Sequence, residues 1–206
     1  LFPLVTHEIP DYNLNRILNY GAIPSIYNSA YPDKDLAAYV GNYLKEEIQA
    51  EGLTRNLGAF SRFLEAASFS QGNILNISSV ARDCSVERKV VENYFSILED
   101  LLMAYRVPVF TKKAKRRLVE HPKFYLFDVG VYRTVRPMGP LDQPEEAEGI
   151  SLETLLFQEL LAMNGYLGLG YKIFYWRTAS GLEVDFILYG PRGLRALEIK
   201  RTGKVT

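Results

Sequence analysis

Hydrophobic residues recur at helical spacing along the first part of the chain. One pattern runs over residues 11–20, from a possible cap at Asp11, and ends at Gly21. A second pattern begins at Asp33 or Asp35 and keeps its apolar residues on one stripe. Residues 1–54 are therefore predicted to form a helical segment.

Three further helical patterns and two strands follow between residues 55 and 135. The third helical pattern starts near Glu87 and keeps one apolar stripe over about three turns. The segments 105–110 and 123–128 alternate as strands do, and a basic turn joins them. Helix, short helix, long helix and hairpin is the order of a winged helix-turn-helix. We predict this motif over 55–135.

The last third of the chain changes from helix to strand. Residues 136–150 combine prolines with acidic side chains and are predicted to be a linker. A helix capped by Ser151 follows it. Strands are then predicted at 172–177, 182–189 and 194–200. A second, α/β domain is therefore expected over residues 151–206, and the fold class of the whole chain is α+β.

The last two predicted strands form a hairpin with four charged residues on one face. If the turn is centred between residues 191 and 192, residues at equal distances from this centre pair across the two strands, so the two numbers of each pair sum to 383. Asp185 then faces Glu198, and Glu183 faces Lys200. Because side chains alternate along a strand, all four share one face and the apolar residues take the other.

Opposed carboxylates repel each other unless a positive charge lies between them. Mg²⁺ prefers carboxylate oxygens, so Asp185 and Glu198 are candidate metal ligands. Lys200 would hold a phosphate or a water, and Glu153 on the preceding helix would add a third carboxylate. Such a site suits phosphodiester hydrolysis, because a metal ion polarises a phosphoryl oxygen and lowers the pKa of bound water. The alternative is a Glu183–Lys200 ion pair beside solvated carboxylates.

The order of these elements resembles the PD-(D/E)xK nuclease fold, and the whole chain resembles the C-terminal module of prokaryotic predicted AAA+ ATPases. The matching stretches are Phe2-Pro3-Leu4 with Glu8, Gly21-Ala22-Ile23-Pro24, Tyr94 to Leu98-Glu99, Pro122-Lys123-Phe124-Tyr125 with Asp128 and Gly130, Leu152-Glu153 with Glu159-Leu160, Tyr175-Trp176-Arg177-Thr178, Glu183-Val184-Asp185-Phe186 and Glu198-Ile199-Lys200. Val184 stands where the motif's name has proline.

The resemblance implies a restriction-endonuclease-like domain after the winged helix. It assigns Asp185, Glu198 and Lys200 to the catalytic positions of the nuclease motif, and Glu153 to the helix acid. It also implies a preceding P-loop domain. The chain contains no G-x-x-x-x-G-K-[ST], so ATP is expected to bind only through that missing domain. A non-catalytic module that binds a partner or regulates the ATPase is the alternative, because a fold does not determine a function.

Two groups of cations are candidate DNA contacts. Arg88 and Lys89 lie near the start of the long helix, where a recognition helix meets DNA. The turn between the two strands of the winged helix holds Lys112, Lys113, Lys115, Arg116 and Arg117, with Lys123 beyond it. Such a patch suits contacts with phosphates. A purely structural helix and a solvated turn are the alternatives.

Composition narrows these possibilities. The chain has 24 basic and 24 acidic residues, so it is not a globally basic nucleic-acid binder. One cysteine excludes an intrachain disulfide framework. There is neither a signal peptide nor an apolar run long enough to span a membrane, so a cytoplasmic protein is expected. The chain starts without Met and stops soon after a predicted strand, so we expect a piece of a longer protein, and an oligomer is possible.

Overall fold

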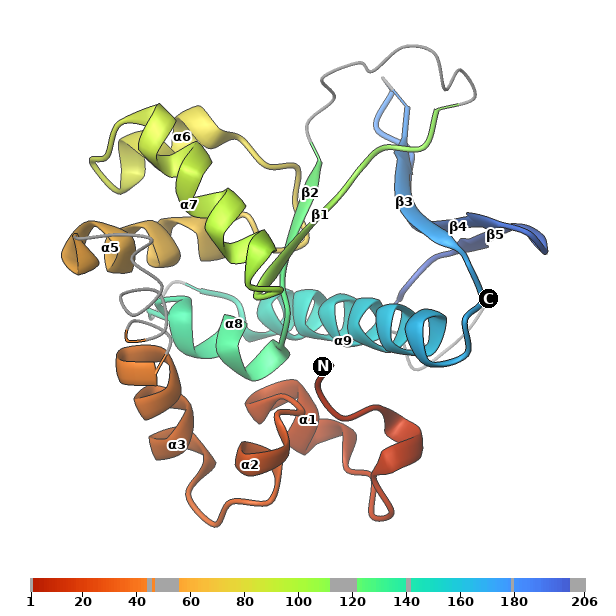
Figure 1. Ribbon diagram of the computed structural model, residues 1–206, viewed down its shortest axis with the longest axis horizontal. Coiled ribbons are helices and arrows are strands. Elements are labelled where there is room, and N and C mark those ends of the chain that lie inside the picture. Colours follow the sequence, from red (N-terminus) through yellow and green to blue (C-terminus); the bar gives the residue numbers. More distant parts are fainter. Residues whose placement is uncertain are drawn as a thin grey trace.

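The computed structural model describes residues 2–43, 46, 56–111, 122–139, 142–178 and 180–200. It is a mixed α/β structure with two small antiparallel sheets. Figure 1 shows the pair β1 and β2 between a group of helices on one side and the sheet of β3, β4 and β5 on the other. No helix in the described part of the chain has the length and apolar character that a membrane crossing needs.

The N-terminal segment is helical, as predicted, but it is more broken than the sequence pattern indicated. Its elements are a 3₁₀ turn at Thr6–Glu8, α1 at Leu14–Tyr20, α2 at Pro24–Tyr27, α3 at Pro32–Ala38 and a π-helical turn, η2, at Tyr39–Tyr43. Asn13, rather than Asp11, caps α1, because its side chain accepts a hydrogen bond from the backbone N–H of Arg16. Gly21 ends this helix with φ of 72°, a left-handed conformation that favours glycine.

Three helices and a hairpin follow in the predicted order. They are α5 at Leu57–Ser68, α6 at Ile77–Asp83, α7 at Arg88–Asp100, β1 at Ala104–Val107 and β2 at Lys123–Leu126. Their shared core contains the rings of Phe60, Phe63, Phe95 and Phe124. The assignment of these elements to a winged helix-turn-helix stays a prediction.

Two helices differ from the sequence prediction. Helix α8 at Val129–Val135 was not expected, and it directly follows β2. Helix α9 spans Pro144–Tyr166, so it begins seven residues before Ser151. Ser151 is wrong as a cap, because its hydroxyl donates to the carbonyl of Ala147 inside the helix. Residues 144–150, predicted as part of a linker, are therefore helical.

The C-terminal sheet has the strand order β3-β4-β5. Its strands are β3 at Lys172–Arg177, β4 at Glu183–Gly190 and β5 at Gly193–Leu197. Phe186 pairs with Leu197 and Gly190 with Gly193, so paired numbers sum to 383 and the predicted register is confirmed for these pairs. The ladder ends at Leu197, so residues 198–200 lie beyond it.

The two sheets are joined by hydrogen bonds. The backbone N–H of Phe110 donates to the carbonyl of Tyr175 at 2.6 Å, and the N–H of Tyr175 donates to the carbonyl of Pro108 at 3.0 Å. A common core of Val107, Tyr125, Phe157, Tyr175 and Phe186 also lies between the hairpin, α9 and the C-terminal sheet. Strand β2 is therefore held close to both α9 and β4.

Asp128 fixes the N-terminal segment to α8. Its buried carboxylate caps α8 by accepting from the N–H of Val131 at 3.0 Å, and it also accepts from the N–H of Ala22 at 2.8 Å. Burial raises the pKa of Asp128. At Gly130 a β-carbon would lie 2.2 Å from the carbonyl oxygen of Tyr20. The absence of a side chain at this position lets α1 approach α8.

Candidate functional site

Lys123 is the centre of a buried charged cluster. Its side chain is only 3% exposed. The Nζ atom lies 2.5 Å from Glu183 Oε1, 3.1 Å from Glu153 Oε1 and 3.9 Å from Asp185 Oδ1. We call Lys123, Glu153, Glu183 and Asp185 the Lys123 cluster. Its members come from β2, α9 and β4, so the cluster joins the hairpin to the C-terminal helix and sheet.

The alternation of β2 explains why a lysine is buried there. Phe124 and Leu126 point into the core formed with α5 and α7, so Lys123 and Tyr125 take the opposite side, toward α9 and β4. The Tyr125 hydroxyl donates to Glu153 Oε1 at 2.5 Å. The Lys123 ammonium also lies 5.8 Å from the centre of the Tyr175 ring.

Burial and the opposite charges of neighbouring groups shift the pKa values of Lys123 and Glu153 in opposite directions. Burial by itself lowers the pKa of Lys123, but the carboxylates of Glu153 and Glu183 outweigh it, so the net shift is upward and the ammonium is charged at neutral pH. Burial raises the pKa of Glu153, and Lys123 and Tyr125 only partly offset that rise. Burial and the neighbouring Glu153 also raise the pKa of Tyr125, so the phenol stays neutral.

The structure gathers only part of the predicted nuclease site. Glu153 and Asp185 lie in the Lys123 cluster, and the second oxygen of Asp185 accepts from the N–H of Ile199 at 2.7 Å. Glu198 and Lys200 instead face each other at 3.7 Å in exposed positions. Among the described residues neither of them has an ion pair with the Lys123 cluster.

The alternative cross-strand pair of Glu183 and Lys200 is not formed either. Glu183 binds Lys123, and its other carboxylate oxygen lies 3.6 Å from Arg177 Nη1. Arg177 and Glu183 are also paired across β3 and β4. The β4–β5 ladder does not reach Glu183, and the main partner of Glu183, Lys123, comes from a distant strand.

The Mg²⁺ site at Asp185 and Glu198 stays a prediction. Within the described residues no three His, Cys, Asp or Glu side chains are grouped so that they could hold a metal ion. A cavity of about 270 Å³ nevertheless lies beside Glu153. Its lining is formed by Glu145, Glu146, Gly149, Ile150, Leu152, Glu153 and Ile199. Three carboxylates therefore border one open space.

The candidate DNA contacts are only partly described. Arg88 and Lys89 lie in the first turn of α7, and both are exposed. Arg88 pairs with Glu92 at 3.0 Å, so part of its charge is balanced within the helix. The predicted phosphate contacts Lys112, Lys113, Lys115, Arg116 and Arg117 lie outside the described residues.

Lys123 is the main functional residue that the sequence patterns did not identify. They grouped it with the basic turn as a surface cation, whereas its side chain is buried. One signal could have identified it. It lies in the run Lys-Phe-Tyr-Leu-Phe, and a charged residue inside an apolar strand is either at an edge or buried with a partner. The strand is buried at every position, so the second case holds.

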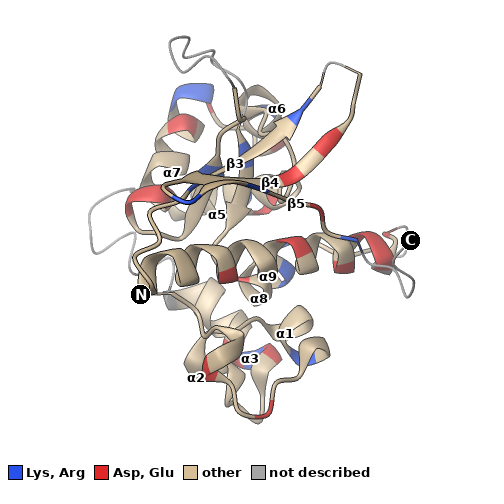
Figure 2. Ribbon diagram, turned by 90° about the vertical axis from the view of Figure 1, so that its right-hand side faces the viewer, with Lys and Arg blue, Asp and Glu red and all other residues tan. Residues whose placement is uncertain are grey.

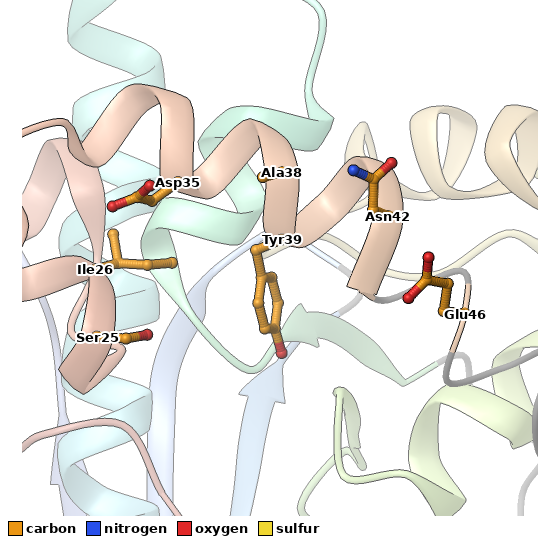
Figure 3. A pocket seen from close by; sticks show the side chains of 7 residues that line it. All are labelled: Ser25, Ile26, Asp35, Ala38, Tyr39, Asn42 and Glu46. Carbon is orange, nitrogen blue, oxygen red and sulfur yellow. The ribbon is translucent and has the colours of Figure 1, made fainter.

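A second cavity, of about 590 Å³, lies in the N-terminal segment, and no residue of the Lys123 cluster lines it. It is lined by Ser25, Ile26, Asp35, Ala38, Tyr39, Asn42 and Glu46. Figure 3 shows Asp35 and Glu46 toward opposite ends of this group of lining side chains, with Tyr39 between them. None of these residues was singled out by the sequence patterns as a site.

Comparisons with known proteins place the chain among uncharacterised relatives. Residues 148–206 match the family described as "Domain of unknown function (DUF4143)". The chain is similar to "Uncharacterized protein Rv2008c" of Mycobacterium tuberculosis and to "Uncharacterized protein Mb2031c" of Mycobacterium bovis. Each is 22% identical over 207 residues, which cover 97% of this chain and 45% of the relative.

The chain thus spans less than half the length of these curated relatives. No solved structure matches it. Residues 11–142, which are more than half of the chain, match a second family. The chain therefore belongs to the family described as "Domain of unknown function (DUF8612)".

Proposed function

We propose that this chain is a non-catalytic module of a larger ATPase of the AAA+ class, and that it contacts DNA through a winged helix. The observation that carries the non-catalytic part of this proposal is the position of the Lys123 ammonium. It lies among the carboxylates that a hydrolytic metal ion would need. The nuclease-like part is then a structural element that holds the hairpin against α9 and β4.

Metal-dependent hydrolysis requires carboxylate oxygens that are open to a cation. Glu153 and Asp185 direct oxygens toward Lys123 instead, and Asp185 uses its other oxygen for the N–H of Ile199. Lys200, the residue expected to position a water or a phosphate, is exposed and pairs with Glu198. This arrangement supports a structural role for the carboxylates.

The ATPase context rests on sequence. The chain resembles the C-terminal modules of AAA+ ATPases, and its last part matches DUF4143, which is consistent with such a module. The curated relatives are more than twice as long as the matched region. ATP would bind in the additional part of the protein, because this chain has no P-loop motif.

A metal-dependent nuclease is the second candidate. The observation that favours it is that Glu153 and Asp185, two of the residues assigned to the nuclease motif, lie in one cluster, and carboxylates are the preferred ligands of Mg²⁺. In that case a cation would draw Glu153 away from Lys123, and Asp185 would turn from Ile199 to the metal.

A cleavage assay separates the two candidates. The full-length protein is incubated with plasmid and single-stranded DNA in the presence of Mg²⁺ or Mn²⁺, beside the variants Asp185→Ala and Lys200→Ala. The proposal predicts no cleavage above a metal-free control. Cleavage that both variants abolish would overturn the proposal and establish the nuclease.

DNA contact is tested separately by fluorescence anisotropy with a labelled duplex across a range of salt concentrations. Removing one phosphate contact should lower the slope of log affinity against log salt concentration, the salt slope, by about 0.9. We expect this for Lys89→Ala and a larger loss for the double change of Arg116 and Arg117 to Ala. Lys34→Ala, an exposed lysine of α3, is the matched control. Unchanged affinity and slope in both variants would refute the DNA contact.

A further inference from the structure

The outer face of the C-terminal sheet carries an aromatic surface. Along β3, Lys172, Phe174 and Trp176 share one side, whereas Ile173 and Tyr175 pack into the core on the other. The register then extends this outer face across the sheet. Lys172 pairs with Tyr189 and Tyr189 with Leu194, while Phe174 pairs with Ile187.

Two rings on this face, Trp176 and Tyr189, are open to solvent, and the half-buried ring of Phe110 contacts Phe174 and Tyr189. Phe110 lies with its ring centre 5.5 Å from that of Phe174 and 5.7 Å from that of Tyr189. Trp176 is 36% exposed, Tyr189 53% and Leu194 49%. Large exposed apolar groups that gather on one face mark a binding surface more often than single ones do.

The charges around this face are unbalanced. Lys172 and Arg192 are exposed and form no ion pair within the described residues. Lys172 lies on β3, and Arg192 lies in the turn between β4 and β5. The acids of the same sheet, Glu183 and Asp185, are at the start of β4 and are bound to Lys123. Figure 2 shows the red start of β4 and the blue segments elsewhere on the sheet.

We propose that this face binds single-stranded nucleic acid. Its bases would stack on Trp176 and Tyr189, because every base has a π-face that an aromatic ring can cover. Its phosphates would lie near Lys172 and Arg192. A duplex fits less well, since its base faces are already stacked inside the helix.

The inference goes beyond the proposed duplex contact at α7. It uses other residues and another ligand, so either proposal can fail without the other.

Trp176 is the one tryptophan of the chain, which gives a direct signal. The test titrates the full chain with an oligothymidylate of about 15 nucleotides, within the usual site size for such proteins. We expect quenching of the tryptophan emission and a matching rise in the anisotropy of a labelled oligonucleotide. Both signals should weaken as salt increases.

Substitutions then locate the surface. Tyr189→Ala should weaken binding about ten-fold, which corresponds to the loss of one stacked base. Trp176→Phe should keep anisotropy-detected binding within a few-fold, whereas Trp176→Ala should weaken it about ten-fold. Lys172→Ala, at an exposed position of this face, should reduce the slope of log affinity against log salt concentration by about 0.7. Tyr31→Ala, an exposed tyrosine of the N-terminal segment, is the matched control and should change nothing.

Several results would overturn the proposal. One is the absence of quenching by the oligonucleotide. Another is equal binding by the wild type and by folded Tyr189→Ala and Lys172→Ala variants, with folding checked by circular dichroism. A third is a dimer that Tyr189→Ala dissociates and that excludes the oligonucleotide, because a second copy would then be the occupant. Lys89→Ala should leave oligothymidylate affinity unchanged, so a failure here remains separate from a failure at α7.

Discussion

Replacing Lys123 with methionine should strongly destabilise the protein. Methionine keeps most of the volume of the side chain but removes the ammonium that faces three carboxylates at 2.5, 3.1 and 3.9 Å. Two opposite charges about 3 Å apart attract by about 5 kcal/mol at an effective dielectric constant of about 20. Desolvation of both charges offsets part of this. Breaking a buried ion pair by removing one partner costs about 3–5 kcal/mol, which is the loss of unfolding free energy we expect for Lys123→Met.

Urea denaturation followed by circular dichroism measures this loss. The matched control is Arg88→Met, which removes the exposed pair with Glu92 and should cost at most about 0.5 kcal/mol. Adding Glu153→Gln to Lys123→Met should recover part of the loss, since it removes an uncompensated charge, and the coupling between the two changes should exceed about 1 kcal/mol. A loss below about 1 kcal/mol for Lys123→Met would refute the view that the ammonium balances the cluster.

The same variant should respond to pH. A carboxyl group whose pKa is raised in the folded state favours the fold when it is protonated, and this contribution is lost as pH rises from its unfolded value through its folded value. Burial already raises the pKa of Glu153, and removing Lys123 removes the main influence that lowers it. The loss caused by Lys123→Met should therefore be smaller near pH 5 than near pH 8. An equal loss at both pH values would contradict this assignment.

Three further predictions concern the backbone and the buried carboxylate. Leu102 has φ of 58° and is 55% exposed, so Leu102→Gly should raise the unfolding free energy by about 0.5–1 kcal/mol in urea denaturation. Gly130→Ala should lower the unfolding free energy by about 2–3 kcal/mol, because the new carbon meets the backbone of Tyr20. Gly149→Ala, with open space around it in α9, should raise the unfolding free energy by about 0.5–1 kcal/mol. A similar effect of both changes would be inconsistent with the packing of α1 on α8. Asp128→Ala should cost about 2–4 kcal/mol and expose the N-terminal segment to proteolysis, and an unchanged proteolytic pattern would count against its bridging role.

Local patterns predicted the parts of the fold that local geometry determines. The register of β4 and β5 follows from their alternation and from the turn between them, and the pairing of Phe186 with Leu197 confirms it. The core side of the same hairpin was also predicted correctly at these two residues. The prediction that Glu183 and Asp185 lie on the face opposite the core is wrong, because they face β2 and α9, as Phe186 does. The ladder between β3 and β4 has an irregularity at this point, which breaks the simple alternation.

Lys123 shows most clearly what local patterns do not predict. Its partner Glu153 is 30 positions away, and Glu183 and Asp185 are farther still. Nothing in the neighbourhood of Lys123 in the sequence indicates which acids the fold brings to it. A run of cations just before it made a surface position more plausible than a buried one.

The start of α9 illustrates a different error. Pro144, Glu145 and Glu146 suggested a linker because proline and acidic residues are frequent in loops. The same residues are also favoured in the first turn of a helix, where proline needs no N–H partner and carboxylates face the positive end of the helix dipole. The structure follows the second possibility.

The central claim is that Lys123, and not a metal ion, balances the carboxylates of Glu153, Glu183 and Asp185. Nitrogen NMR of the lysine ammonium groups during a titration with MgCl₂ tests it most directly, with Lys123→Met identifying the signal. We expect the Lys123 ammonium signal to be protected from exchange and unchanged by Mg²⁺ at millimolar concentration. A saturable shift of that signal, abolished by Asp185→Ala, would show that the cation enters the cluster and would contradict the account.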